Sequence, residues 1–307
     1  MSEANRIVRA TLDSLSAHIA LVDASGEIFM TNEAWRGFAQ ANGTLTHEVS
    51  EGAHYLDICD AAGRAGVEEA AVFAEGLRSV LDGGLREFAM EYPCHSPTEE
   101  RWFVARATRF LAGDDGLEGA VVAHEDITER KLAEEATAHL ALHDPLTDLP
   151  NRRLLRDRLG QALSHAERDG SAVAVLYLDL EGFKAVNDSL GHEAGDRVLV
   201  GVAERLKRCI RPQDTAARLG GDEFTVLLEE LADAGDATRI AERISQSLTS
   251  PFDLGETTAS VRSSIGISLG GPDVEDPADL LRLADLAMYQ AKTEGKARYR
   301  VFGREDV

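Results

Sequence analysis

The chain lacks the features that would place it in a membrane or outside the cell. No apolar run approaches the roughly 20 residues that a membrane-spanning helix needs, and the N-terminus has no apolar signal-peptide core. The 307 residues include only three cysteines, Cys59, Cys94 and Cys209, and no two of them form a C-x-x-C pair. A disulfide framework or a structural zinc site is therefore not expected, and we predict a cytoplasmic protein.

Basic residues are also scarce. The sequence has 32 lysines and arginines against 54 aspartates and glutamates, a formal net charge of −22. Such a charge repels nucleic acid and anionic membrane surfaces, so neither is an expected partner. A phosphate-bearing ligand would need metal ions or a local cluster of basic side chains. The length suits about two domains.

The first part of the chain predicts two strands, a helical section and three further strands. An amphipathic pattern indicates a short helix over residues 3–15, and Asn32 is a plausible N-cap for the helix after the second strand. Another helical pattern covers residues 68–81. The predicted strands are residues 18–22, 27–31, 86–92, 101–111 and 117–124.

This order of elements resembles the PAS sensor fold. The segment 125–130, Glu-Asp-Ile-Thr-Glu-Arg, is similar to the Asp-Ile-Thr segment that often closes such domains and starts an output helix. The resemblance implies a PAS-like sensor domain over residues 18–127, preceded by an N-terminal helix within residues 1–17.

The ligand of this domain stays unknown from the sequence. PAS domains bind haem, flavin, small metabolites or nothing, and the cysteine motif of light-sensing flavin relatives is absent. His54, His95 and His124 are isolated, and a lone histidine is more often a surface or core residue than a haem ligand.

A polar helix is predicted to connect the two halves. Residues 128–143 contain no glycine or proline, and Leu132, Ala136 and Leu140 recur every four residues. The stripe is too short to hold an isolated helix in water. It indicates either a brief coiled coil with a second subunit, and hence a homodimer, or a solvated spacer helix. Asp144-Pro145 ends the helix.

A buried strand in the second half ends in acidic residues. Residues 172–178 form a continuous apolar run, typical of a central strand buried on both faces, and Asp179 follows it. A carboxylate at the end of such a strand is costly unless it meets a cation, so Asp179 is a candidate metal ligand. The strand period of two places Glu181 on the same side and turns Leu180 away.

The next polar residues suit a nucleotide. Lys184 stands where a helix is predicted to begin, and helix-start N–H groups with a lysine form a natural phosphate site. Asn187 and Asp196 can each make the paired hydrogen bonds that read a guanine edge. Taken singly, Asn187 could instead be a helix cap and Asp196 a solvated charge.

Two glycines and two acids form the most informative stretch. Gly220-Gly221 fall between apolar strand patterns at 214–219 and 224–228, at a hairpin where positive φ is needed. Asp222 and Glu223 supply hard oxygen donors suited to magnesium. A lone Gly-Gly-Asp-Glu could also be an ordinary hairpin with a solvated acidic tip.

Together these motifs resemble the GGDEF family of diguanylate cyclases. The resemblance rests on residues 179–196, 218–224 and 287–292, in this order and spacing, and covers about residues 144–302. It implies a mixed sheet flanked by helices, akin to the palm of nucleotide cyclases and polymerases. It also implies condensation of two GTP molecules into cyclic di-GMP with release of two pyrophosphates. The whole chain would then be an α+β protein, with the GGDEF domain over residues 144–307.

The resemblance also implies roles for the acidic residues. Asp179 and Asp222 would hold two magnesium ions per active site through their side chains, and Leu180 would add its backbone carbonyl. Glu223 would assist the attacking 3′-hydroxyl, either as a base or by metal contact. The intact acidic turn favours an active enzyme. The alternative is a catalytically silent receptor that binds cyclic di-GMP or GTP.

Further residues would contact GTP and the product. Lys292 and Lys296 would reach the γ-phosphate or, alternatively, be solvated charges, and many relatives have arginine at position 296 and aspartate at position 181. The motif R-x-x-D at Arg211 to Asp214 would bind cyclic di-GMP as a feedback inhibitor, with Arg243 as a second contact. The implied GTP-binding residues are Phe183, Lys184, Asn187, Asp196, Lys292 and Lys296.

Overall fold

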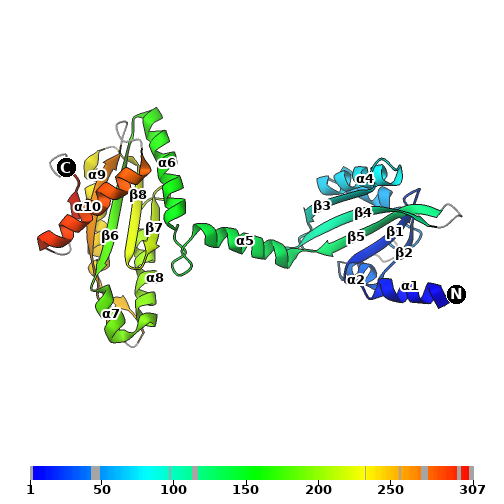
Figure 1. Ribbon diagram of the computed structural model, residues 1–307, viewed down its shortest axis with the longest axis horizontal. Helices are drawn as coiled ribbons and strands as arrows, with labels where there is room; N and C mark the ends of the chain where they lie inside the picture. Colours follow the sequence, from blue (N-terminus) through cyan, green and yellow to red (C-terminus); the bar gives the residue numbers. More distant parts are fainter. Residues whose placement is uncertain are drawn as a thin grey trace. The chain divides into compact units, whose positions relative to one another are not determined.

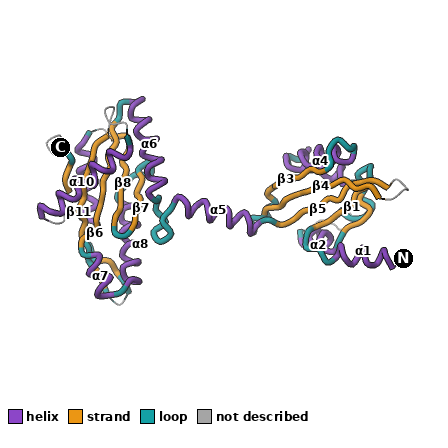
Figure 2. Tube along the Cα trace, in the orientation of Figure 1, coloured by secondary structure: helices purple, strands orange, loops and turns teal. Residues whose placement is uncertain are grey.

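A computed structural model of the protein describes residues 3–42, 49–96, 98–112, 117–231, 233–255, 257–270, 276–295 and 299–303. The chain separates into two compact units, Met1–Ala136 and Thr137–Val307. Figure 1 follows the chain from its N-terminus to its C-terminus, and Figure 2 marks the helices and strands of each unit. None of the described helices is both long and apolar enough to cross a lipid bilayer.

The first unit is built on an antiparallel sheet of five strands in the order β2-β1-β5-β4-β3. The PAS-like fold predicted from the sequence is therefore confirmed. Its strands are β1 (His18–Asp23), β2 (Ile28–Thr31), β3 (Glu87–Pro93), β4 (Trp102–Ala112) and β5 (Leu117–Asp126). Its helices are α1 (Glu3–Asp13), α2 (Glu33–Ala41), α3 (Tyr55–Arg64) and α4 (Glu68–Leu81).

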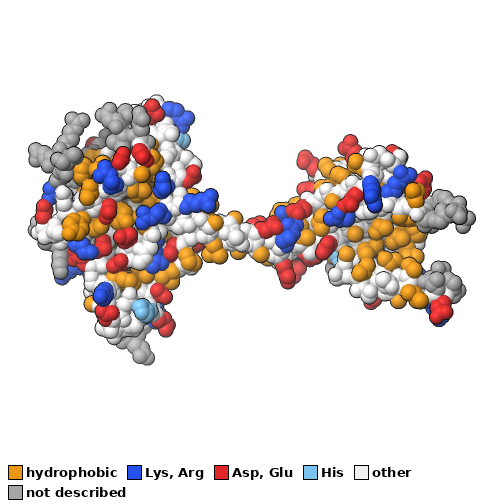
Figure 3. All heavy atoms as spheres, in the orientation of Figure 1, with side chains coloured by type: hydrophobic (Ala, Val, Ile, Leu, Met, Phe, Trp, Pro, Cys, Tyr) orange, Lys and Arg blue, Asp and Glu red, His pale blue; other side chains and the backbone are white. Residues whose placement is uncertain are grey.

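One face of this sheet forms the core with α2, α3 and α4. Asn32 begins α2, as predicted, because its Oδ1 accepts the N–H group of Trp35 at 3.0 Å. The same oxygen accepts the N–H group of Ile19 at 2.9 Å, and the side-chain amide donates to the carbonyl of Ala17 at 2.8 Å. Figure 3 shows hydrophobic side chains gathered on one surface of this unit. Among the large hydrophobic residues of the unit, Phe29 and Leu111 are 38% and 73% exposed.

The second unit has a mixed sheet, as predicted, and its five strands lie in the order β12-β11-β6-β8-β7. Only the β11–β12 pair is parallel among the described strands. The strands are β6 (Ala172–Glu181), β7 (Thr215–Gly220), β8 (Glu223–Leu231), β11 (Arg262–Gly270) and β12 (Tyr299–Val301), with a separate pair β9 (Phe252–Asp253) and β10 (Thr258–Ala259). The helices are α6 (Arg152–Asp169), α7 (Phe183–Leu190), α8 (His192–Arg208), α9 (Ala234–Thr249) and α10 (Pro277–Gly295).

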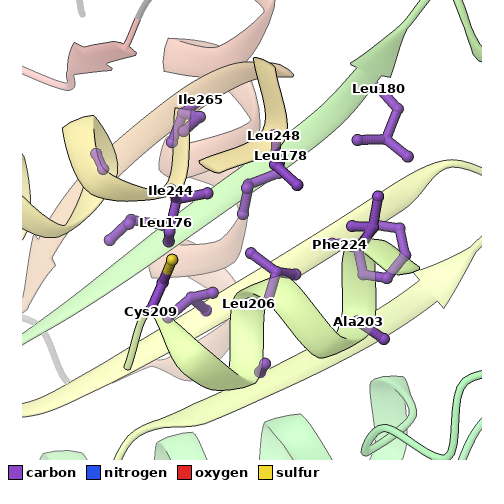
Figure 4. Packing of buried hydrophobic residues seen from close by; sticks show 14 of the residues in the cluster. Leu176, Leu178, Leu180, Ala203, Leu206, Cys209, Phe224, Ile244, Leu248 and Ile265 are labelled. Atoms are coloured by element: carbon purple, nitrogen blue, oxygen red, sulfur yellow. The ribbon is translucent and has the colours of Figure 1, made fainter. Parts of the chain in front are cut away.

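Strand β6 separates two hydrophobic layers. Its even-numbered side chains from 174 to 180 pack with α8 and α9, in a layer that includes Leu178 and Phe224 (Figure 4). Its odd-numbered side chains from 173 to 177 pack with residues of α6 and α10. The alternation therefore turns Asp179 toward the α6 and α10 side, while Leu180 stays in the opposite layer.

Helix α5 (Thr128–Leu142) begins directly after β5 and contains no buried residue. Arg130 and Lys131, in its first turn, each lie 2.5 Å from Glu91 on β3. Leu132 and Leu140 are 50% and 56% exposed. Their pairing with a second subunit stays a prediction.

Candidate active site

Asp179 and Glu223 lie opposite each other where β6 pairs with β8. The hydroxyl of Tyr177, two residues before Asp179, donates a hydrogen bond of 2.9 Å to Oε2 of Glu223. Nη2 of Arg152, at the start of α6, lies 4.0 Å from the same oxygen. A buried hydroxyl and a guanidinium therefore orient the Glu223 carboxylate.

The two glycines of the β7–β8 hairpin place Asp222 at its tip. Gly220 and Gly221 have φ angles of +140° and +53°, in the region that favours glycine, as the sequence predicted. A Cβ atom on either residue would meet no other described atom within 4 Å. Glycine is thus needed at these positions for their positive φ angles, and the space beside the turn stays open to a ligand.

The acidic side chains share one ammonium group. Nζ of Lys292, on α10, donates to Oδ2 of Asp179 at 2.7 Å, and this hydrogen bond raises the pKa of the lysine. Burial raises the pKa of Asp222, and the charges of Asp179 and Glu223 act in the same direction. The three carboxylates carry more negative charge than Lys292 and Arg152 together neutralise, so the group is suited to a further cation.

The donor set fits magnesium. Within the described part of the chain, no group of three or more His, Cys, Asp or Glu side chains is arranged to hold a metal ion. Magnesium is usually held by only one or two carboxylates together with water and substrate phosphates, so the carboxylates of Asp179 and Asp222 fit it. Leu180 is 2% exposed with its side chain in the core, so only its backbone could contribute.

The guanidinium of Arg218 braces the glycine turn. It donates to the Gly221 carbonyl from Nη2 at 2.8 Å and from Nε at 3.1 Å. Nη1 lies 2.9 and 3.1 Å from the two carboxylate oxygens of Asp144. Burial raises the pKa of Asp144, but hydrogen bonds from Thr147 and Arg218 outweigh it, and the pKa is lowered. The segment after α5 is thus bound to the hairpin.

Of the two residues of α7 expected to contact the phosphates, one is exposed and the other is buried. Gly182 begins α7 with a φ of +86°. Lys184 is exposed in the first turn, where the sequence placed it. The side chain of Phe183 is only 9% exposed and packs in the hydrophobic layer, so only its backbone is available for a phosphate.

The two residues expected at guanine come together through a close helix contact. A Cβ atom on Gly195 would lie 1.9 Å from Oδ1 of Asn187, so glycine lets α8 approach α7 there. The neighbouring Asp196 is exposed. Oδ1 of Asn187 is buried and has no hydrogen-bond partner among the described atoms, which suits an oxygen kept for a ligand.

The remaining expected residues lie apart from the acidic group. Asp214 is 8% exposed, and its carboxylate accepts the N–H groups of Arg211 at 2.8 Å and Glu229 at 3.3 Å, so it shapes the loop. The Arg211 side chain is exposed. Arg243 donates to the Cys209 carbonyl at 2.5 and 3.1 Å, which brings it to the same loop.

Two other expectations concern positions 181 and 296. Glu181 accepts a hydrogen bond of 2.5 Å from the hydroxyl of Ser264 on β11. Lys296 lies outside the described residues.

Sequence reasoning missed three residues of the site: Tyr177, Arg152 and the role of Arg218. The strand period of two could have identified Tyr177, because it places residue 177 on the same side as Asp179. The contacts of Arg152 and Arg218 join segments far apart in the chain, and no local signal in the sequence predicts them.

The fold and the site define a class of protein: a PAS-like antiparallel sheet domain is followed by a mixed-sheet domain, whose paired carboxylates suit a cation that binds phosphates. Comparison with known proteins is more specific. A family model described as "Diguanylate cyclase, GGDEF domain" matches residues 141–298, and one described as "PAS fold" matches residues 12–132. The chain belongs to the GGDEF diguanylate cyclase family.

Curated relatives match this chain mainly over its second half. Diguanylate cyclase TpbB of Pseudomonas aeruginosa is 47% identical over 165 residues, which cover 53% of this chain and 38% of the relative. The bifunctional diguanylate cyclase/cyclic di-GMP phosphodiesterase MucR of the same species is 49% identical over 163 residues, 53% of this chain and 24% of MucR. The cyclic di-GMP phosphodiesterase PdeR of Escherichia coli is 39% identical over 180 residues, 59% of this chain and 27% of PdeR. The chain thus spans well under half the length of these relatives.

Solved structures agree on the second unit. The GGDEF domain of TpbB from P. aeruginosa aligns with a TM-score of 0.52 at 45% identity, over 53% of this chain and 96% of that one. The coiled coil and GGDEF domain of DgcB from Caulobacter crescentus, in complex with c-di-GMP, aligns with a TM-score of 0.52 at 28% identity, over 57% of this chain and 93% of that one.

Proposed function

We propose that this protein condenses two GTP molecules into cyclic di-GMP and releases two pyrophosphates. The observation that carries the proposal is the intact acidic turn: Asp222 and Glu223 stand on a glycine hairpin beside Asp179. Membership of the GGDEF family and the name of the relative TpbB support the same activity.

In the proposed reaction, the 3′-hydroxyl oxygen of each GTP forms a bond to the α-phosphorus of the other, and each time the bond to pyrophosphate breaks. Glu223, oriented by Tyr177 and Arg152, would take up the hydroxyl proton or help to hold the cation. Two magnesium ions, held by Asp179, Asp222 and the Leu180 carbonyl, would neutralise charge on the phosphates.

The remaining residues would bind and position GTP. Lys184 and the backbone N–H groups at the start of α7 would meet phosphate oxygens, and Asn187 with Asp196 would read the guanine edge. Lys292, hydrogen-bonded to Asp179, stands close enough to the carboxylates to approach the phosphates when GTP binds. Lys296 is proposed for the γ-phosphate from its sequence position alone.

Regulation is part of the same proposal. We infer a PAS sensor over residues 18–127, a connector over residues 128–143 and a cyclase domain over residues 144–307, acting in a cytoplasmic homodimer. Each subunit would hold one GTP, so the connector helices would control how the two halves of the active site meet. Cyclic di-GMP would inhibit by binding at the loop of Arg211 and Asp214, with Arg243 beside it.

The activity can be tested directly with the full chain. After removal of any bound product, the protein is incubated with GTP and Mg²⁺, and the nucleotides are separated by chromatography. We expect cyclic di-GMP from the wild type and a loss of at least about a hundredfold in Glu223→Gln, because the proposed proton acceptor is removed. Glu204→Gln, the same change at an exposed position of α8, is the matched control and should keep the wild-type rate.

If the wild type binds GTP or cyclic di-GMP but forms no product, the cyclase proposal is wrong and the receptor alternative takes its place.

A further inference from the structure

The first unit contains a pocket of about 370 Å³ that the proposed cyclase chemistry does not use. Tyr55, Tyr92 and His124 line it, and the same three residues line a neighbouring pocket of about 190 Å³. The rest of the larger pocket is mostly apolar and formed by α3, α4 and β3, with side chains that include Ile58, Ala62, Ala70, Phe73 and Met90.

A chain of hydrogen bonds crosses this apolar surface. The hydroxyl of Tyr55 lies 2.9 Å from Nε2 of His124, and the hydroxyl of Tyr92 lies 2.7 Å from Nδ1 of the same ring. Tyr55 also forms a hydrogen bond with the thiol of Cys59. Burial lowers the pKa of His124 to about 4, so its imidazole is neutral at pH 7. We call Cys59, Tyr55, His124 and Tyr92 the buried relay.

The buried relay can be hydrogen-bonded in two ways, because a neutral imidazole has one N–H donor and one acceptor nitrogen. In the first, Tyr92 donates to Nδ1, Nε2–H donates to Tyr55, and the Tyr55 hydrogen is directed to Cys59. In the second, Tyr55 donates to Nε2, Nδ1–H donates to Tyr92, and the Tyr92 hydrogen is left for an acceptor outside the relay. Four hydrogens share three hydrogen bonds, so each arrangement leaves one hydrogen unpaired within the relay. The first leaves the S–H group of Cys59, a weak donor, whereas the second leaves the Tyr92 hydroxyl hydrogen, which costs more free energy until an acceptor arrives.

We propose that this pocket binds a neutral, largely apolar small molecule with one hydrogen-bond acceptor, and that the acceptor takes the hydroxyl hydrogen of Tyr92. Binding would convert His124 from the Nε2–H to the Nδ1–H tautomer. A cavity of about 150 Å³ with an apolar lining holds benzene, so a pocket of 370 Å³ suits a molecule of about bicyclic size.

The charge of the pocket selects against anions. Among the described residues that line it, Glu69 carries a charge and none is a lysine or arginine. A carboxylate or phosphate ligand would lose its hydration without gaining a cationic partner. The relay lies on β5 at His124, four residues before the first residue of α5, so a ligand there acts on the strand that continues into the connector.

The test uses the full chain and three probes of one shape. 2-Acetylnaphthalene has a ketone acceptor, 2-isopropenylnaphthalene replaces the oxygen by CH₂, and 2-naphthoate is an anion. Both tryptophans of the chain, Trp35 and Trp102, lie in the first unit, so their fluorescence reports binding there, and calorimetric titration gives the Kd. We expect the ketone to bind about fivefold more tightly than the hydrocarbon, and the anion to bind far more weakly than both.

Two variants connect this preference to the pocket. Tyr92→Phe should bind the ketone and the hydrocarbon equally, and Tyr299→Phe, the same change in the second unit, should keep the wild-type preference. Ala62→Leu fills part of the pocket and should weaken both neutral probes. Thermal unfolding followed by tryptophan fluorescence verifies that each variant is folded.

Nitrogen-15 NMR of labelled histidine supplies an independent measurement. The ketone should move the His124 signals from the Nε2–H to the Nδ1–H pattern, and the hydrocarbon should leave them unchanged. Equal affinity of the wild type for ketone and hydrocarbon, tight binding of the naphthoate, or an unchanged tautomer with the ketone bound would each overturn the proposal. None of these measurements depends on GTP turnover, so this proposal and the cyclase proposal fail separately.

Discussion

At the scale of single residues, the proposed reaction depends on how Glu223 is held. Its Oε2 accepts the Tyr177 hydroxyl at 2.9 Å, and Tyr177 itself is only 6% exposed between β6 and the helices that cover it. Burial raises the pKa of Tyr177, and its hydrogen bond to Glu223 adds to that effect, so the hydroxyl stays a donor throughout the neutral range. We therefore regard Tyr177 as a positioning residue for Glu223.

Replacing Tyr177 by phenylalanine removes one hydroxyl and leaves the buried ring in place. A hydrogen bond to a charged group contributes about 1.5–3 kcal/mol, so we expect kcat for cyclic di-GMP formation to fall roughly tenfold or more. The KM for GTP should stay unchanged, because Tyr177 is not proposed to touch the nucleotide. Initial rates over a range of GTP concentrations measure both quantities.

The matched control is Tyr289→Phe, since Tyr289 is 65% exposed on α10. It should keep the wild-type kcat. A Tyr177→Phe enzyme with an unchanged kcat, or with only KM altered, would refute the positioning role.

The sequence predicts some residue placements and misses others for a physical reason. The alternation of Asp179, Leu180 and Glu181 follows from the period of a strand and is confirmed. The burial of the Phe183 side chain was not predicted, because it depends on how α7 lies against the sheet. The partners of His124 are 69 and 32 residues away in the chain, so a lone histidine in the sequence carries no sign of them.

At the scale of elements, Arg218 joins the segment between α5 and α6 to the β7–β8 hairpin. Its side chain is 10% exposed and that of Asp144 is 16% exposed, so the pair is largely shielded from solvent. One guanidinium reaches both the Asp144 carboxylate and the Gly221 carbonyl. A planar group with several fixed donors can do this, and a single ammonium cannot.

Arg218→Lys should therefore loosen the hairpin while keeping the charge. We expect the free energy of unfolding of the second unit to fall by about 1.5–3 kcal/mol, the contribution of a hydrogen bond to a charged group. The rate of cyclic di-GMP formation at saturating GTP should fall as well, because Asp222 adjoins the loosened Gly221. Urea titration followed by circular dichroism measures the first effect, and tryptophan fluorescence identifies the transition of the first unit.

Arg153→Lys makes the same change at an exposed position of α6 and should alter neither quantity. If both variants have the same free energy of unfolding and the same rate, the hydrogen bonds of Arg218 to Asp144 and Gly221 do not stabilise the second unit.

At this scale the strands could be predicted from the sequence, but the register in which they pair could not. Hydrophobic patterns identified the strands around the glycine pair and the central apolar strand, and both are confirmed. The register that sets Glu223 opposite Asp179 is decided by packing across β6 and β8. No local pattern contains that register, and Tyr177 could not be assigned to Glu223 without it.

At the scale of the whole molecule, the two units can be observed separately. Trp35 and Trp102 are the two tryptophans of the chain, and both belong to the first unit. Their fluorescence follows the unfolding of that unit within the intact protein.

The first unit should lose stability in mild acid. The pKa of His124 is about 4 in the folded state, against 6.5 for an unperturbed histidine, so the unfolded chain binds more protons between these values. The contribution of neutral His124 to the free energy of unfolding is therefore fully present above pH 6.5 and is lost as the pH falls toward 4. We expect the free energy of unfolding to drop by roughly 2 kcal/mol between pH 7 and pH 5. Burial also lowers the pKa of His18, which adds a change of the same sign.

His124→Gln keeps a donor and an acceptor without the titration, so its unfolding free energy should vary less over this range. His95→Gln changes an exposed histidine of the same unit and should keep the wild-type dependence. Equal pH dependence in the wild type and His124→Gln would contradict the assignment to His124.

The length of helix α5 can be changed by insertion or deletion of residues. Because it contains no buried residue, residues can be inserted or removed along it without opening a cavity in either hydrophobic core. Each inserted residue nevertheless turns everything that follows by about 100° around the helix axis and shifts it by about 1.5 Å. The angle and length that α5 adds can therefore be changed without repacking either core, provided that the ion pairs of Arg130 and Lys131 with Glu91 at its start are kept. A different N-terminal domain joined to this GGDEF domain should accordingly be matched in helical phase.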